Sequence, residues 1–211
     1  MSLNILPHNT IITFDIHGVL FKPHFKKIAS LVWCNKRALK VGFYFLNPKF
    51  TFQVIKLLYK QAVPEEYFMT LTSKYPSLLR YRPLAIAISN AQKPVPQIIE
   101  LVQHLKARGY TLHIFSNIGE HIFADLAHTH AHIFTLFDKA HVPNRRTGYI
   151  GKKHPESFAL YNQLYNSDKK NIVLIDDNKN NICRAAHVGI TGIYFKNINQ
   201  LYSALHRLKI I

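Results

Sequence analysis

The sequence predicts an α/β fold: a Rossmann-like, doubly wound, mainly parallel sheet joined to a small α-helical cap domain. Short, almost continuously apolar segments of strand length alternate with segments of helical periodicity, and three of these strands end in polar residues. Near-continuous apolar strands are buried on both faces, as in parallel sheets. A long early stretch without this alternation indicates an inserted helical domain.

Length and composition favour one folded unit with a modest insertion. The chain has 211 residues, of which 48% are hydrophobic and 18% charged, so a disordered chain is excluded. No apolar run approaches the roughly 18 residues of a membrane span, and the first ten residues lack the regions of a signal peptide. Two cysteines form no disulfide framework. We therefore expect a cytoplasmic protein without a membrane partner.

The expected strands are apolar and rich in β-branched residues. They cover residues 10–15, 110–116, 171–176 and 189–195, with a weaker candidate at 137–142. The expected helices lie between them, at residues 96–106, 155–165 and 180–187. The first ends before Gly109, the second begins at Pro155, and the third leads to Gly189, as helix boundaries often do. This order predicts one core built from residues 1–20 and 93–211.

Residues 21–92 are expected to form the helical cap domain. Ile28, Leu31 and Val32 have helical spacing, and so do the apolar residues between 54 and 58. Prolines 64, 76 and 83 would divide the helices, because proline lacks the backbone N–H that a helix interior requires. The insertion therefore follows the first strand, and the second half of the core resumes at residue 93.

Polar residues follow three of the expected strands: Asp15, Ser116, and the pair Asp176 and Asp177. In an open parallel sheet, ligands bind outside the carboxyl ends of the strands. These side chains should therefore converge on one crevice, although they lie far apart in the sequence. A single carboxylate at a strand end could instead cap the next helix.

The combination of motifs resembles the haloacid dehalogenase superfamily of hydrolases, with a helical cap of the type inserted after the first strand. The family's first motif, Asp-x-Asp-Gly-Val/Thr-Leu after an apolar strand, is similar to residues 14–20, FDIHGVL. The second is a strand ending in Ser or Thr, as in residues 115–117, FSN. The third is a lysine before a helix, as in residues 151–156, GKKHPE. The fourth is an apolar strand with paired acids, as in residues 174–178, LIDDN.

The resemblance implies a role for each matched position. Asp15 is the nucleophile that forms an aspartyl-phosphate. A Mg²⁺ cofactor is bound by Asp15, Asp176 and the main-chain carbonyl of His17. Asp177 binds the ion through water or orients the lysine. Ser116 and the backbone N–H of Asn117 hold the phosphoryl oxygens. Lys152 neutralises the developing charge, and we favour it over Lys153 because its spacing to Pro155 matches the motif.

His17 departs from the family pattern, in which phosphatases have an acid/base aspartate at this position. Three interpretations stay open: the imidazole takes over the proton transfers, the leaving group needs little protonation, or the protein binds a phosphorylated ligand without turnover. We rank a Mg²⁺-dependent phosphatase of a small phosphorylated metabolite first. A catalytically impaired ligand-binding protein is the alternative. A dehalogenase that cleaves a carbon–halogen bond comes third, because the paired acids indicate a metal.

The formal net charge of +16 is consistent with an anionic partner. The basic residues of the chain are scattered as isolated pairs such as Lys26–Lys27 and Arg145–Arg146, and no nucleic-acid-binding motif is present. We therefore expect a small anionic substrate rather than a nucleic acid as the partner, with nucleic acid not excluded.

Overall fold

The computed structural model describes residues 6–34, 44, 46–52 and 70–211, and its centre is a five-stranded parallel sheet. The strands are β1 (Thr10–Phe14), β4 (Thr111–Phe115), β5 (Lys139–His141), β6 (Asn171–Asp176) and β7 (Thr191–Tyr194), in the order β5-β4-β1-β6-β7. All four neighbouring pairs are parallel. The doubly wound α/β core predicted from the sequence is therefore confirmed, including its weakest strand, β5.

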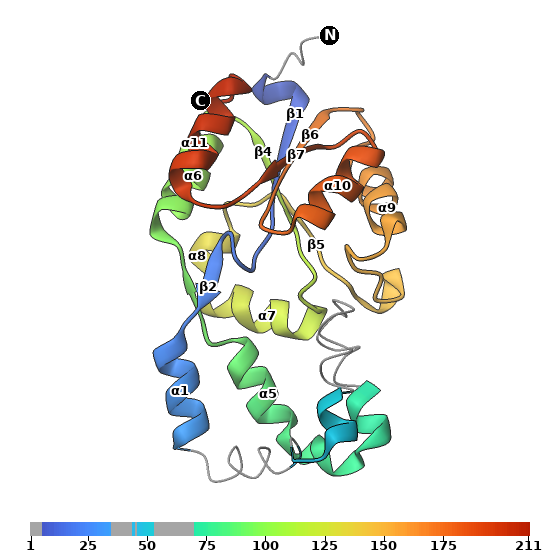
Figure 1. The fold of residues 1–211 in the computed structure, drawn as a ribbon. Helices are drawn as coiled ribbons and strands as arrows, with labels where there is room; N and C mark the ends of the chain where they lie inside the picture. The colour runs from blue at the N-terminus through green and yellow to red at the C-terminus, as the bar shows by residue number, and fades with distance from the viewer. Residues whose placement is uncertain (1–5, 35–43, 45, 53–69) are drawn as a thin grey trace.

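Helices cover both faces of this sheet (Figure 1). On one face, α6 (Pro96–Ala107), α7 (Glu120–Thr129), α8 (Ala131–Phe134) and α11 (Ile198–Arg207) share an apolar core with Ile12 and Phe14 of β1. On the other face, α9 (Pro155–Tyr165) and α10 (Lys179–His187) pack against Ile11. Successive strand residues point to opposite faces, so the apolar residues of β1 serve both cores, and Thr10 and Thr13 are buried with them.

The insertion joins the core through a two-stranded ribbon. Strand β2 (Phe21–Pro23) pairs antiparallel with β3 (Gln92–Pro94), so both ends of the predicted 21–92 insertion lie in or beside this ribbon. Beyond it are α1 (Phe25–Trp33), the 3₁₀ helix η2 (Pro76–Tyr81) and α5 (Arg82–Ser89), which lie past the carboxyl ends of the sheet strands (Figure 1). Here a small apolar cluster forms from Phe50, Leu71, Leu78 and Tyr81.

Several local features differ from the sequence-based expectation. The ribbon strands β2 and β3 and helices α7, α8 and α11 were not expected, and neither were the short 3₁₀ helices η1 (Pro7–Asn9) and η3 (Arg145–Thr147). Pro76 and Pro83 lie in the first turns of η2 and α5, as predicted. The apolar spacing at residues 54–58 and Pro64 lie outside the described residues. Within the described residues, no helix is long and apolar enough to cross a membrane.

Candidate active site

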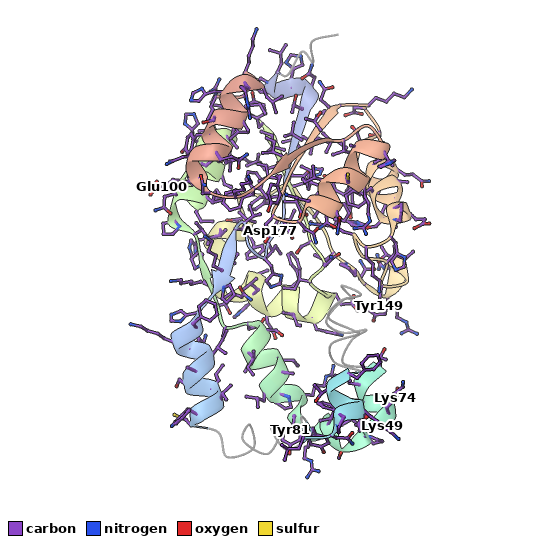
Figure 2. The ribbon with its side chains drawn as sticks, viewed as in Figure 1. Lys49, Lys74, Tyr81, Glu100, Tyr149 and Asp177 are labelled. Atoms are coloured by element: carbon purple, nitrogen blue, oxygen red, sulfur yellow. The ribbon has the colours of Figure 1, made fainter. Side chains whose placement is uncertain are left out.

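Three aspartates meet at the carboxyl ends of β1 and β6, the two central neighbours in the sheet. Asp15 directly follows β1, Asp176 ends β6 and Asp177 follows it. One carboxylate oxygen of each lies within 4.8 Å of the others. Asp15 and Asp176 are buried, whereas Asp177 is exposed at the junction between the sheet and the inserted helices (Figure 2). This arrangement brings three carboxyl groups together at the carboxyl ends of β1 and β6.

Lys152 lies between two of these carboxylates. Its ammonium is 2.6 Å from Asp176 Oδ2 and 3.2 Å from Asp15 Oδ1, and the side chain has no exposed surface. Lys153 is partly exposed. Of the two adjacent lysines, Lys152 is therefore the one that the loop before α9 directs into the site.

Asp176 is held by more than the lysine. Its Oδ1 accepts a hydrogen bond from the backbone N–H of Asn178 at 2.8 Å, and the Asn181 amide donates to both carboxylate oxygens at 3.1 Å. Asn178 also caps α10 by accepting from the N–H of Asn180. Neither asparagine was assigned a role from the sequence. A signal was present for Asn181, a polar residue on the buried side of the helix that follows the paired acids.

Ser116 and Asn117 occupy the loop after β4. Ser116 Oγ is buried and forms no hydrogen bond of ordinary geometry, although its hydroxyl is near enough to lower the pKa of Asp15. The side chain of Asn117 accepts a hydrogen bond from the backbone N–H of Lys152 at 2.6 Å. The sequence predicted a role only for the backbone of Asn117. Its side chain in fact joins this loop to the loop that carries Lys152.

A tight turn between β1 and β2 carries His17 and Gly18. Gly18 has a positive φ of +79°, which favours glycine, and a side-chain carbon here would collide with the Asp177 carboxylate. His17 is mostly buried, and burial lowers the pKa of its imidazole although the Asp15 carboxylate opposes the shift. Both residues therefore lie at the site that the sequence predicted.

The acidic and basic groups perturb one another. Burial raises the pKa of Asp15, Lys152 opposes that change and Asp176 adds to it. Burial and the two neighbouring carboxylates raise the pKa of Asp177 to about 6. Burial alone would lower the pKa of Lys152, but Asp15 and Asp176 outweigh it and raise that pKa. The crowded carboxylates thus carry more negative charge than the Lys152 ammonium balances, and a bound cation would relieve the excess.

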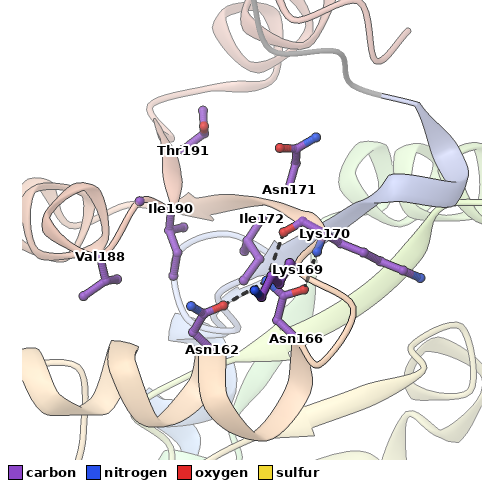
Figure 3. A pocket seen from close by; sticks show the side chains of 10 residues that line it. Asn162, Asn166, Lys169, Lys170, Asn171, Ile172, Val188, Ile190 and Thr191 are labelled. Carbon is purple, nitrogen blue, oxygen red and sulfur yellow. Dashed lines mark hydrogen bonds between the residues drawn. The ribbon is translucent and has the colours of Figure 1, made fainter.

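A separate cavity of about 230 Å³ lies at the amino ends of β6 and β7, at the opposite end of these strands from the three aspartates (Figure 3). It is lined partly by Asn162, Asn166 and Lys170. The Asn166 side chain hydrogen-bonds Asn162 and the Lys170 backbone, so it closes the turn after α9. None of the residues predicted for the site lines this cavity.

Comparison with known proteins agrees with the geometry. The family model of the haloacid dehalogenase-like hydrolases matches residues 10–189. No curated protein matches the chain.

Solved structures with the same fold include enzymes of different chemistry. The chain is 15% identical to L-2-haloacid dehalogenase from Xanthobacter autotrophicus with covalently bound chloropropionic acid, covering 98% of this chain and 85% of that one, with a TM-score of 0.60. It is 18% identical to a haloacid dehalogenase family enzyme from Bacteroides thetaiotaomicron in complex with magnesium and inorganic phosphate, covering 92% and 98%, with a TM-score of 0.61. A predicted hydrolase of this family from Porphyromonas gingivalis is 19% identical, covering 95% and 97%, with a TM-score of 0.61. At these identities the likeness shows the fold, and the family match extends over most of the sequence. The chain therefore belongs to the haloacid dehalogenase-like hydrolases.

Proposed function

We propose that this hydrolase is a Mg²⁺-dependent phosphatase that acts on a small phosphorylated metabolite through an aspartyl-phosphate intermediate. The observation that carries the proposal is the meeting of Asp15, Asp176 and Asp177 within 4.8 Å, with the Lys152 ammonium between two of them. A dehalogenase needs a carboxylate nucleophile but no Mg²⁺, whereas three carboxylates this close together are suited to a metal ion. The magnesium and phosphate in the Bacteroides relative support the same choice.

The three carboxylates suit Mg²⁺, a hard cation that prefers oxygen ligands and commonly binds one or two carboxylates together with substrate phosphate and water. Burial, and then the neighbouring Asp15 and Asp176 carboxylates, raise the pKa of Asp177 to about 6, and a cation would offset the repulsion between these carboxylates. Asp15 and Asp176 would bind the ion directly, with the main-chain carbonyl of His17, and Asp177 would bind it through water or orient Lys152. The ion would screen the repulsion between an anionic nucleophile and an anionic phosphate.

The remaining steps belong to the chain's own side chains. An Asp15 oxygen attacks phosphorus, a bond forms between them, and the bond from phosphorus to the leaving oxygen breaks. Lys152 neutralises the charge that builds up on the phosphoryl oxygens. Ser116 Oγ, which is buried without a hydrogen bond of ordinary geometry, can donate to one of these oxygens. The Asn117 backbone N–H would donate to another.

Hydrolysis of the intermediate requires a proton acceptor for water. His17 lies two residues after Asp15, and burial lowers the pKa of its imidazole, which favours the neutral form that can accept that proton. The same neutral ring is a poor acid for the first step, so the best substrates should have leaving groups that need little protonation. If neither His17 nor a reactive leaving group supports turnover, the site binds a phosphorylated ligand without hydrolysing it.

Hydrolysis of p-nitrophenyl phosphate tests the proposal, because its leaving group needs little protonation. We expect turnover with Mg²⁺ that is lost in EDTA and restored by excess Mg²⁺. Asp15→Asn should reduce it at least ~10³-fold, because the amide is not a nucleophile. Full activity in EDTA or in Asp15→Asn would contradict the proposal. Absence of turnover at every pH from 5 to 9 would favour the ligand-binding alternative.

A further inference from the structure

A stack of buried rings lies beneath the Lys152 side chain, between the sheet and α9. The Lys152 ammonium is 5.2 Å from the centroid of the Phe115 ring. The Tyr161 ring stacks on the Phe115 ring and is almost parallel to it. The ring centroids are 4.8 Å apart, and the angle between the ring planes is 6°. All three side chains are buried. The aromatic face of Phe115 therefore supports the cation, and Tyr161 supports Phe115.

The Tyr161 hydroxyl bridges two strands of the sheet. It lies 2.8 Å from Thr13 Oγ1 in β1 and 2.8 Å from His113 Nδ1 in β4. Thr13 precedes the nucleophile Asp15 by two residues, and His113 precedes Ser116 by three. One buried oxygen thus connects α9 to the two strands whose ends carry Asp15 and Ser116.

The same helix follows the loop that carries Lys152, so Tyr161 is connected to three of the four segments that form the site. Lys152 has a long side chain whose ammonium contacts Asp15 and Asp176 at unequal distances of 3.2 and 2.6 Å. The position of the ammonium relative to the nucleophile depends on how α9 lies against β1 and β4. A phenylalanine ring would fill the same space as Tyr161, but only the hydroxyl makes directional bonds to both strands.

We propose that Tyr161 is a positioning residue of the active site: its hydroxyl fixes β1 and β4 against α9, and its ring supports Phe115 under Lys152. The proposal rests on the proposed function, because the role assigned to Lys152 is to stabilise a transferred phosphoryl group. Tyr161 touches neither Asp15 nor a phosphoryl group in this arrangement and acts through its neighbours.

Tyr161→Phe removes the hydroxyl and keeps the ring, and Tyr165→Phe is the matched control on the same helix. Tyr165 packs against Tyr161, His113 and His141, but its hydroxyl is not part of the bridge. The readout is the inhibition constant of orthovanadate, which mimics the five-coordinate transferred phosphoryl group. An inhibition constant does not depend on the fraction of active enzyme, so a merely structural role would leave it unchanged.

Tyr161→Phe removes the hydrogen bonds to Thr13 and His113, and we expect it to weaken orthovanadate inhibition about 5- to 10-fold. Tyr165→Phe should leave the inhibition unchanged. Thr13→Val should weaken it as well, and the double variant Thr13→Val/Tyr161→Phe should lose less than the product of the two single effects, because they break the same bond. Phe115→Leu removes the ring that contacts the Lys152 ammonium. This variant should also raise the inhibition constant of orthovanadate.

Unchanged inhibition constants in Tyr161→Phe and Phe115→Leu, with only a lower melting temperature, would overturn the inference. A wild-type protein without turnover would contradict the proposed function and not this inference. In that case, calorimetric titration of the Mg²⁺-supplemented protein with inorganic phosphate replaces the inhibition assay. Equal phosphate affinity in the wild type and Tyr161→Phe would then overturn it.

Discussion

Both carboxylate oxygens of Asp176 already accept hydrogen bonds from the protein. Asn178 and Asn181 donate to one oxygen, and Lys152 and Asn181 donate to the other. A carboxylate held on both sides cannot rotate freely, so its orientation toward Asp15 is set before any ligand binds. The paired acids alone would not guarantee this orientation.

Asn181→Ala should therefore weaken Mg²⁺ binding. Loss of a hydrogen bond that orients a metal ligand typically costs 10- to 100-fold in affinity, and we expect a decrease of about that size. Calorimetric titration with Mg²⁺ measures it. Asn180→Ala is the control, because Asn180 is exposed and contacts the Asn178 side chain only through its backbone N–H. Equal affinities for the two variants would show that Asn181 does not orient Asp176.

Gly18→Ala should disturb the site in two ways. The alanine would have to adopt a φ of +79°, and its Cβ would displace the Asp177 carboxylate. We expect a loss of about 1 kcal/mol in unfolding free energy and a higher Mg²⁺ concentration for half-maximal activity. Gly148→Ala is the control, because Gly148 also has a positive φ, of 60°, but no atom lies within 4 Å of an added Cβ. Only Gly18→Ala should change the Mg²⁺ requirement.

His17→Asp distinguishes an adapted imidazole from a lost acid. If the phosphatase proposal holds and His17 is a weak acid, aspartate should raise kcat for alkyl phosphates, whose leaving groups need a proton, about 10- to 100-fold. The rate with p-nitrophenyl phosphate should change much less. A fall in both rates would show that the imidazole itself performs the proton transfers.

At the scale of elements, the sequence predicted the parts whose apolar pattern is local. Strands β1, β4, β6 and β7 were expected within one or two residues of their bounds because each lies in a local run of apolar and β-branched residues. The ribbon strands β2 and β3 were missed because each has three residues and is defined only by pairing across some seventy residues of sequence. Helix α11 was missed because it lies beyond the last matched motif.

Strands β4 and β5 each carry one buried histidine, His113 and His141. These two histidines should make the folded protein less stable in acid. Burial lowers the pKa of His113 and His141 to about 4, whereas an unfolded histidine titrates near 6.5. Between these values the unfolded state binds more protons, so stability is fully present above pH 6.5 and falls as pH decreases toward 4. Each histidine should account for roughly 2–3 kcal/mol over this range.

Urea unfolding at several pH values between 7 and 4.5 measures this loss. His141→Gln, which does not titrate, should reduce the slope of stability against pH by about half. His8→Gln changes an exposed histidine and serves as the control. A slope that His141→Gln leaves intact would show that other groups control acid unfolding.

At the scale of the whole molecule, the +16 charge contrasts with the acidic crevice. A positive surface attracts an anionic substrate from a distance, and salt screens this attraction over about 8–10 Å. If the substrate is a phosphorylated metabolite, kcat/KM should fall about three- to tenfold between 20 and 300 mM salt. The value of kcat should change little, because a bound substrate no longer needs steering. Steady-state kinetics over this range, at constant free Mg²⁺, provide the test. An unchanged kcat/KM would assign the surface charge a role other than substrate attraction.

The sequence by itself determined the parallel core, the family, and the positions of Asp15, Ser116, Asp176 and Asp177, because each of these residues ends or follows a strand with a local pattern. The tertiary structure decided which of two adjacent lysines enters the site. It also revealed Asn181 beside Asp176, and the hydroxyl of Tyr161 between β1 and β4. These contacts join residues that are distant in the sequence or share a helix with many similar side chains. Strand periodicity specifies which face a residue occupies, but only the packing of one element on another specifies which atoms meet.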